Sequence, residues 1–360
     1  MITTLKDTAV VIEKGNDYQE WASYAASCSK ANIYHLPEWS IILQESFGYI
    51  PYHLLAKDTN GKVQGILPLF LVKSLISGNR LVSLPFSYNC GPIADSDNIL
   101  YSLLEESKRL TDSLKCRYLE IKVMKDGEDL SSNSFWKQNK FEVVDQFSTF
   151  VLDLSQPDTV WKKLDPRVRQ HIRRAKRDDV KITKGNSIKA IRTFYKLNLR
   201  TKKRIGVPGH PESLFINMFE KLSDKCILYL AELQGEIIAG IIIQKFNNIV
   251  LYGYGASNDK YRMHQPNSLL LWTAIEEACQ DGYRYFDFGR TSPIEQSVTL
   301  FKKHWGTEEK NLAYYYYPCI PNSMALNQNG ITFKIANSLW KKLPLPLARI
   351  CSNKIFAHLG

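Results

Sequence analysis

The sequence lacks a long hydrophobic run, a cysteine pattern and a metal-binding motif. No apolar stretch approaches the ~18 residues of a transmembrane helix, so we expect no membrane-spanning segment. The seven cysteines are scattered, odd in number and never spaced C-x-x-C, which favours a reducing cytoplasm over a disulfide framework or a zinc site. The seven histidines form no H-E-x-x-H pair. We therefore expect neither a metal nor a bound cofactor.

The first residues also lack the apolar core of a signal peptide, because acidic and basic residues alternate there, so we expect a cytoplasmic protein. Acidic residues are the scarcer charge overall, with 36 Asp and Glu against 47 Lys and Arg and a net charge of +11. This balance favours an anionic partner such as nucleic acid, a phosphorylated substrate or a membrane surface. A basic soluble protein without such a partner would have the same composition.

Acidic residues are absent after Glu309, whereas basic residues continue to Lys354. Residues 319–360 therefore form a basic tail, in which Phe333, Trp340 and several leucines lie among lysines. This composition is typical of an amphipathic segment that touches a membrane surface, here the inner face of the cell membrane. A tail helix that packs against the preceding domain is the alternative, and the composition does not decide between the two.

The same order of elements occurs in both halves of the 360-residue chain, which is long enough for two ordinary cores. A β-hairpin, a strand, a helix and another strand follow one another, with the hairpin turns at Gly61 and Gly235. We therefore predict an α/β fold made of two copies of one unit, residues 1–155 and 156–318. The matched later elements are Arg80–Ile93 with Val250–Ala256, Ile99–Leu114 with Asn267–Gln280, and Tyr118–Val123 with Tyr285–Phe288.

Four segments of the second half carry a resemblance to a known family. They are Tyr252–Ser257, Pro266–Ala278, Phe286–Gly289 and the Phe-Lys-x-x-Trp-Gly sequence at Phe301–Gly306. In this order they resemble the acyltransferase half of the Fem-type (FemAB-like) aminoacyl transferases and, more broadly, the GNAT-like N-acyltransferase superfamily. The resemblance implies two tandem GNAT-like domains with mixed sheets flanked by helices, the second being the acyltransferase.

The resemblance assigns the central role to Lys302, which matches the family lysine near the donor carbonyl or the terminal phosphates. A surface lysine on a short helix is the alternative. Asp287 could accept the proton of the attacking amine, or it could only anchor Arg290 or a backbone turn. We expect Arg290 and Phe301 to contact substrate beside these two residues.

Further substrate contacts are predicted from the elements around this centre. Tyr252 and Tyr254 alternate to one face of their strand and could hold the acceptor, although core packing explains them equally well. Asn267 is either a ligand or a helix cap. Arg200 is a candidate for binding a substrate phosphate or carboxylate, because a guanidinium grips such groups with two hydrogen bonds.

A strongly basic helix separates the two halves, with eight Lys and Arg between Lys162 and Arg177. Arg169, Arg173 and Lys176 share one side of it, and an apolar side is predicted opposite them. One interpretation is a phosphate-binding surface for tRNA or a sugar nucleotide, whose affinity would fall steeply with salt. The other is a solvated face above an ordinary docking stripe.

The donor and the acceptor follow from two departures from the family patterns. Coenzyme A users usually carry a glycine-rich turn before the helix at Pro266, but Arg262–Asn267 contains no glycine, which favours aminoacyl-tRNA over acyl-CoA as donor. No insertion is long enough for the paired-helix arm of the wall-bridge enzymes, so the chain resembles the armless relatives linked to surface-polysaccharide or envelope biosynthesis. We expect an N-acyltransferase that acts on an amino group of a peptidoglycan or surface-polysaccharide precursor. A non-catalytic tRNA- or anionic-glycan-binding protein on the same fold is the alternative.

Overall fold

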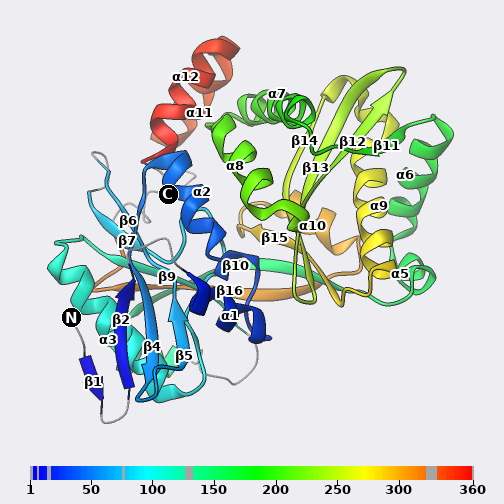
Figure 1. Cartoon of the computed structure of the whole chain (residues 1–360). Helices are drawn as coiled ribbons and strands as arrows, with labels where there is room; N and C mark the ends of the chain where they lie inside the picture. Colours follow the sequence, from blue (N-terminus) through cyan, green and yellow to red (C-terminus); the bar gives the residue numbers. More distant parts are fainter. Residues whose placement is uncertain are drawn as a thin grey trace. The chain divides into compact units, whose positions relative to one another are not determined.

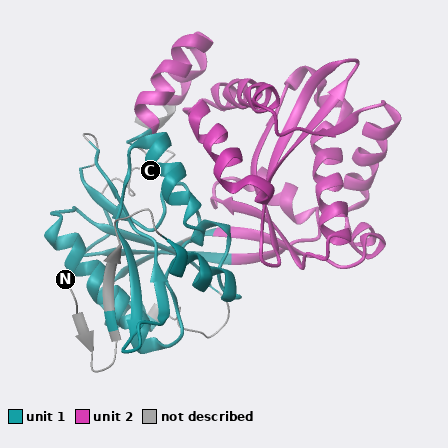
Figure 2. Ribbon diagram, viewed as in Figure 1, with its two compact units in different colours: residues 1–147, 311–327, 357–360 teal, residues 148–310, 328–356 magenta. Residues whose placement is uncertain are grey.

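The computed structural model describes residues 3–5, 8–13, 18–74, 78–125, 133–321 and 331–358 of the chain. The chain divides into two compact units (Figure 2). Among the described residues, no helix is both long and apolar enough to cross a membrane. Unit 1 comprises Met1–Phe147, Asn311–Asn327 and Ala357–Gly360, and unit 2 comprises Ser148–Lys310 and Gln328–Phe356.

The chain changes unit inside two long strands, β10 (Glu142–Asp153) and β16 (Glu308–Tyr317). Residues 148–153 of β10 pair with β15 (Tyr285–Thr291) in unit 2, and residues 312–317 of β16 pair with β9 (Leu119–Met124) in unit 1. The boundaries expected from the sequence, after residues 155 and 318, lie just past these two strands. The sequence pattern indicates where a strand ends. The strand with which its residues pair decides the unit to which those residues belong. The expected tail, 319–360, is likewise divided between the units.

Unit 1 contains a five-stranded sheet, β1-β2-β4-β5-β8, and a second set of strands in the order β16-β9-β7-β6-β3. In the second set, β7 and β9 are parallel, and helix α3 packs on the first sheet through buried Leu103 and Leu104. The strands are β1 (Thr3–Leu5), β2 (Thr8–Glu13), β3 (Ile50–Pro51), β4 (His53–Asp58), β5 (Val63–Leu67), β6 (Phe70–Val72), β7 (Arg80–Val82) and β8 (Ile93–Ala94). The helices are α1 (Gln19–Ser27), η1 (Ile33–His35), α2 (Glu38–Phe47), α3 (Asp97–Ser113) and α4 (Asn133–Gln138).

Unit 2 is a twisted sheet, β11-β12-β13-β14-β15-β10, between two layers of helices (Figure 1). Helices α5, α6 and α9 cover one face, and α7 and α8 cover the other. Its strands are β11 (Lys181–Lys184), β12 (Cys226–Leu233), β13 (Glu236–Phe246) and β14 (Ile249–Ser257), together with β15 and part of β10. Its helices are α5 (Pro157–Lys163), α6 (Pro166–Arg177), α7 (Ile188–Ile205), α8 (Glu212–Leu222), η2 (Ser223–Lys225), η3 (Asp259–His264), α9 (Pro266–Gln280), α10 (Gln296–Lys303), α11 (Ile331–Lys342) and α12 (Leu345–Phe356).

Local sequence signals explain where the helices of unit 2 begin and end. Asp165 accepts the N–H of Arg167 at the start of α6, and proline follows as the first helical residue. Ser187 caps α7 by accepting the N–H of Ala190. Gly206 ends α7 in the left-handed region, at φ +83°, which glycine adopts without strain.

The repeat predicted from the sequence is confirmed by the order of elements. In unit 1 the hairpin β4–β5 is followed by β7, α3 and β9, with the short strands β6 before and β8 after β7, and in unit 2 the hairpin β12–β13 is followed directly by β14, α9 and β15. The strands on either side of each helix are parallel in both units, β7 with β9 and β14 with β15. A parallel pair joined by a helix is the right-handed crossover unit expected of such a pattern.

Candidate functional site

The strands β14 and β15 are paired only where they begin. Their parallel ladder consists of Ile249 with Tyr285, Val250 with Phe286 and Leu251 with Asp287. Beyond this point β14 stays paired with β13 as far as Ser257, and β15 stays paired with β10 as far as Thr291. The two strands therefore part from each other while each keeps its outer neighbour.

A β-bulge in each strand accounts for the divergence. In β14 the register with β13 shifts between Tyr252 and Tyr254, so Gly253 is the extra residue. In β15 the register with β10 shifts between Asp287 and Arg290, where Gly289 has φ +73°. Bulges bend a strand and increase its twist, and they are frequent beside active sites. The point where β14 and β15 separate is therefore built by two glycine-containing bulges.

The bulge at Gly253 changes the faces of the two tyrosines. Tyr252 pairs with Ile243 and Tyr254 with Ile242, which are neighbours in β13 and point to opposite faces of the sheet. The expectation that the tyrosines share one face is therefore wrong, because strict alternation assumes no extra residue. Both side chains are half-buried, and burial raises the pKa of Tyr252 to about 12 and that of Tyr254 further, so both phenols stay neutral hydrogen-bond donors.

The ring contacts of the two tyrosines agree with this division. Tyr252 lies 6.5 Å from Phe288, between ring centroids, and packs on the cluster under α6 and α9. Tyr254 lies 5.0 Å from His210 and 5.2 Å from Phe215, on the side of α7 and α8. The two phenols therefore serve different sides of the sheet.

Lys302 of α10 is buried beside the bulge of β15, with 5% of its surface exposed. Its Nζ donates hydrogen bonds to the carbonyl oxygens of Gly289, at 2.5 Å, and Arg290, at 3.2 Å. Burial lowers the pKa of Lys302 to about 8, although the carboxylates of Asp287 and Glu295 oppose this shift. The alternative of a surface lysine is therefore wrong.

Asp287 holds the same bulge from the other direction. Its Oδ1 accepts the hydroxyl of the fully buried Thr149, at 2.5 Å, and the N–H of Gly289, at 2.8 Å. Gly289 is thus fixed through its N–H by a carboxylate and through its carbonyl oxygen by Lys302. These bonds support the interpretation of Asp287 as the anchor of a backbone turn, and they leave its role as a proton acceptor as a prediction.

The remaining predicted contacts lie on four different elements of unit 2. Arg290 on β15 and Arg200 on α7 are exposed, and Phe301 on α10 is 38% exposed with its ring 6.3 Å from Trp305. Asn267 is exposed and donates to Ser257 Oγ at 3.3 Å. The residue that caps α9 is Gln265, so the interpretation of Asn267 as the helix cap is wrong.

Sequence reasoning missed Glu295. Glu295 accepts the N–H of Ser292 at 2.8 Å, and its charge raises the pKa values of both Lys302 and Lys202, which burial lowers. The spacing Ser-x-x-Glu is a known capping signal and could have indicated Glu295. His210, in the loop after α7, packs against Tyr254, and burial holds its pKa well below the usual value, so its ring is neutral.

The basic residues of helix α6 differ in their surroundings. Val168, Ile172 and Ala175 are buried, as predicted for its apolar side. Arg173 and Lys176 are exposed, and the guanidinium of Arg173 lies 5.8 Å from the ring centroid of Trp161. Arg169 instead caps the end of α5, because its Nη1 donates to three carbonyl oxygens there. Those acceptors are the carbonyls of Trp161, Lys162 and Leu164, at 3.3, 3.1 and 2.7 Å.

We expect Arg169→Ala to lower the free energy of unfolding by about 2 kcal/mol, because charged hydrogen bonds to the last carbonyls of α5 are lost. Arg173→Ala on the next turn is the matched control and should change stability little, since its side chain is exposed. Urea unfolding of both variants measures the difference. Equal stabilities of the two variants would show that the hydrogen bonds of Arg169 to the end of α5 do not stabilise the fold.

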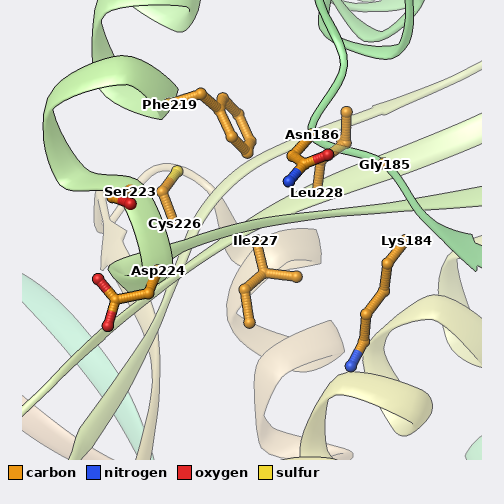
Figure 3. A pocket seen from close by; sticks show the side chains of 9 residues that line it. All are labelled: Lys184, Gly185, Asn186, Phe219, Ser223, Asp224, Cys226, Ile227 and Leu228. Carbon is orange, nitrogen blue, oxygen red and sulfur yellow. The ribbon is translucent and has the colours of Figure 1, made fainter.

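A hollow of about 520 Å³ lies elsewhere in unit 2, at the side of β12 (Figure 3). Lys184 at its rim pairs with Glu277, at 2.6 Å, and burial raises the pKa of the Cys226 thiol, so this cysteine is no activated nucleophile. None of the residues predicted for catalysis lines this hollow, and we do not assign the reaction to it. Its lining residues are Lys184, Gly185, Asn186, Phe219, Ser223, Asp224, Cys226, Ile227 and Leu228.

Comparisons with known proteins agree with this geometry. Residues 162–302 match the Acetyltransferase (GNAT) domain family. The fold is similar to that of FemX and of a tandem GNAT protein over most of the chain, so the GNAT-like resemblance and the fold inferred from the sequence are confirmed. A comparison with curated proteins gives no match.

Three solved structures illustrate the similarity. FemX has a TM-score of 0.69 at 16% identity, over 89% of this chain and 99% of its own. The C-terminal domain of a protein described as a lysylphosphatidylglycerol synthetase from Agrobacterium fabrum has a TM-score of 0.58 at 12% identity, over 91% of this chain and 96% of its own. A tandem GNAT protein from the clavulanic acid biosynthesis pathway has a TM-score of 0.57 at 12% identity, over 86% and 98%. At these identities the likeness concerns the fold.

Proposed function

We propose that the protein is an N-acyltransferase that transfers an acyl or aminoacyl group to an amino group of a cell-envelope precursor in the cytoplasm. The observation that carries this proposal is the separation of β14 from β15 next to buried Lys302, within the region that matches the GNAT family. In GNAT-like sites the donor enters between two such strands. Burial lowers the pKa of Lys302 and therefore costs free energy, and a buried group with a perturbed pKa beside such an opening is a candidate for a functional role.

The reaction joins the nitrogen of a neutral amine to the carbonyl carbon of the donor. The ester or thioester bond of the donor breaks, its oxygen or sulfur leaves with a proton, and the amine loses a proton as the amide forms. Negative charge develops on the carbonyl oxygen, and an ammonium such as that of Lys302 would stabilise it. We propose that the neutral phenol of Tyr254, which lies on the α7 and α8 side, donates a hydrogen bond to the acceptor.

Aminoacyl-tRNA is the donor that we favour, because the start of α9 is poorly suited to a pyrophosphate. Pro266 is the first residue of the helix and has no N–H to offer. The N–H of Ser268 is bonded to the carbonyl of Gln265 at 3.2 Å. A helix start that binds phosphate uses such N–H groups, so acyl-CoA would bind weakly here. Exposed Arg173 and Lys176 on α6 are available for a nucleic-acid backbone.

An envelope precursor is the acceptor that the family resemblance favours, whether peptidoglycan or surface polysaccharide. FemX supports this choice through the Fem-type resemblance, and the name of a second structural neighbour denotes the synthesis of a lysine-bearing lipid. Both similarities concern the fold, so the acceptor has to be identified by experiment.

We expect mass spectrometry to detect transfer when the full chain is mixed with charged tRNAs, or with acyl-CoAs, and a panel of amino-sugar and peptide acceptors. The product should be an acceptor heavier by one aminoacyl group, formed with tRNA donors and not with acyl-CoAs. Transfer from acyl-CoAs alone would contradict the donor assignment. Binding of tRNA or anionic glycan without transfer to any acceptor would support the non-catalytic alternative.

The salt dependence of tRNA binding tests the role of α6 within the same proposal. Arg173→Ala combined with Lys176→Ala should weaken tRNA binding and reduce the slope of log K against log salt by roughly 1.5, since each phosphate contact contributes about 0.7 to 0.9. Turnover at saturating donor should stay near the wild-type value. An unchanged slope would exclude these two residues from the tRNA contact.

A further inference from the structure

The inner face of the C-terminal helices α11 and α12 is packed on α7 and the loop that follows it (Figure 1). Asn337 of α11 donates to the carbonyl oxygens of Ile205, at 2.8 Å, and Gly206, at 3.0 Å, which end α7. The packed-helix interpretation of the tail therefore holds for this face. Three contacts hold α12: Arg349 donates to Glu212 at 2.9 Å, Ser352 Oγ accepts the N–H of Gly209 at 3.0 Å, and the Phe356 ring lies 4.5 Å from that of His210.

The outer face of the same helices is apolar and basic. On α12, Leu347 is 49% exposed, Ile350 is 55% exposed, and Lys354 is exposed. Their spacing of three and four residues places them in one stripe. Buried Ala348, Ser352 and Phe356 recur every four residues on the opposite side of α12.

Helix α11 adds a similar group. Leu339 is 62% exposed, the largest exposed fraction among the large apolar residues that the structure describes, and Lys342, three residues further on the same side of α11, is exposed. No Asp or Glu occurs anywhere from residue 310 to 360. The tail therefore contributes only positive charge to this surface, so it has no carboxylate of its own to neutralise it.

We propose that the outer face of α11 and α12, formed by Leu339, Lys342, Leu347, Ile350 and Lys354, binds an anionic lipid bilayer. Aliphatic side chains flanked by lysines match the boundary between acyl chains and anionic headgroups. A protein partner fits less well, because binding hot spots are rich in Trp, Tyr and Arg. The proposal goes beyond the proposed function and does not depend on it.

Binding of the outer face to a bilayer would also concern the candidate site around Tyr254. The inner face of α12 holds Gly209 and His210, and His210 in turn packs against Tyr254. The helix proposed to touch lipid is therefore separated from Tyr254 of β14 by the single layer of His210. An acceptor that is itself anchored in the bilayer would arrive at this side.

Flotation of the full chain with vesicles tests the proposal. Vesicles of equal parts phosphatidylcholine and phosphatidylglycerol should carry the protein, vesicles of phosphatidylcholine alone should not, and added salt should release it. Lys342→Gln combined with Lys354→Gln should weaken binding roughly twenty-five-fold, at about fivefold for each lysine. Leu347→Ser combined with Ile350→Ser should weaken it at least about tenfold.

The controls use point variants, because truncation would also remove the partners of Gly209 and Ile205. Ile188→Ser replaces another isoleucine of unit 2, 42% exposed on the first turn of α7, and should float like the wild type. Circular dichroism melting checks that each variant is folded. Absence of flotation with anionic vesicles at low salt, or flotation unchanged in both double variants, would overturn the proposal. Self-association that Leu347→Ser with Ile350→Ser abolishes, without lipid binding, would instead show an interface between two copies.

Discussion

Lys302→Ala is expected to lower the turnover of acyl transfer about a hundredfold or more, because one charged donor to the developing oxyanion is removed. The loss should appear in single-turnover measurements at saturating donor, which isolate the chemical step. Binding of the donor should change little. Full activity of Lys302→Ala would refute the role that the family resemblance assigns to this residue, and the site would then centre on Asp287 and Tyr254.

The pH dependence of the wild-type enzyme should report the same group. The ammonium of Lys302 is the acting form, and its pKa is about 8, so the rate should fall as the pH rises through about 8. Arginine keeps its positive charge to much higher pH, so the Lys302→Arg variant should not show this fall in rate, even where the rate of the variant is low. A fall in rate that persists in Lys302→Arg would belong to the titration of a different group, such as the amine of the acceptor.

The free energy of unfolding should also change with pH as Lys302 titrates, and the direction of the change follows from its pKa in the folded and unfolded chain. The unfolded chain holds the Lys302 proton up to a pKa of 10.5 and the folded chain only up to about 8, so unfolding takes up a proton between these values. The wild type should therefore gain stability relative to Lys302→Met as the pH rises from 8 to 10.5, by at most about 3 kcal/mol. Urea unfolding at pH 7 and at pH 10 measures the change. A constant difference between the two proteins would mean that Lys302 is not desolvated.

Two substitutions of Asp287 should distinguish its role as the anchor of a backbone turn from a role as the general base. Asp287→Asn keeps an oxygen that can accept the Gly289 N–H and the Thr149 hydroxyl, so an anchoring role predicts a folded variant with nearly normal turnover. A general base predicts a loss of about a hundredfold to ten-thousandfold in the same variant. The comparison requires single-turnover rates together with unfolding curves.

Asp287→Ala removes both acceptor bonds and serves as the reference. It should cost about 1 to 3 kcal/mol of stability, because the buried N–H of Gly289 is left without its partner. Turnover should fall too, since the bulge also holds the carbonyl to which Lys302 donates. Normal stability of Asp287→Ala would contradict the anchoring role.

The repeated fold could be predicted from the sequence because each signal is local. The hairpin turns at Gly61 and Gly235 and the helical periodicity around Leu270 and Ile275 need no knowledge of distant residues. The divergence of β14 from β15 was harder, since one extra residue in a strand reverses every later side chain. Gly253 inside an aromatic strand was the available sign of a bulge.

The burial of Lys302 and the task of Arg169 could not be predicted, for a common reason. Both side chains bind backbone carbonyl oxygens, and a carbonyl has no residue-type signature in the sequence. Helical spacing therefore placed Arg169 in the same group as Arg173 and Lys176, although its guanidinium is occupied by the end of α5. The composition of the C-terminal tail fitted both a membrane-binding segment and a helix packed on the domain, because helix α12 has a packed inner face and an exposed outer face.

The exchange of strands between the units has a consequence for how the chain folds during synthesis. Unit 1 consists of residues 311–327 and 357–360 in addition to its first 147, and unit 2 includes residues 328–356. Neither unit can complete its contacts while the later segments are still inside the ribosome, so the usual order in which an N-terminal domain finishes first does not apply. Strand pairs such as Leu119 with Tyr317 join residues that are far apart in the sequence, and contacts of this kind slow folding. Nascent unit 1 therefore leaves the edge of β9 without its partner strand until β16 emerges.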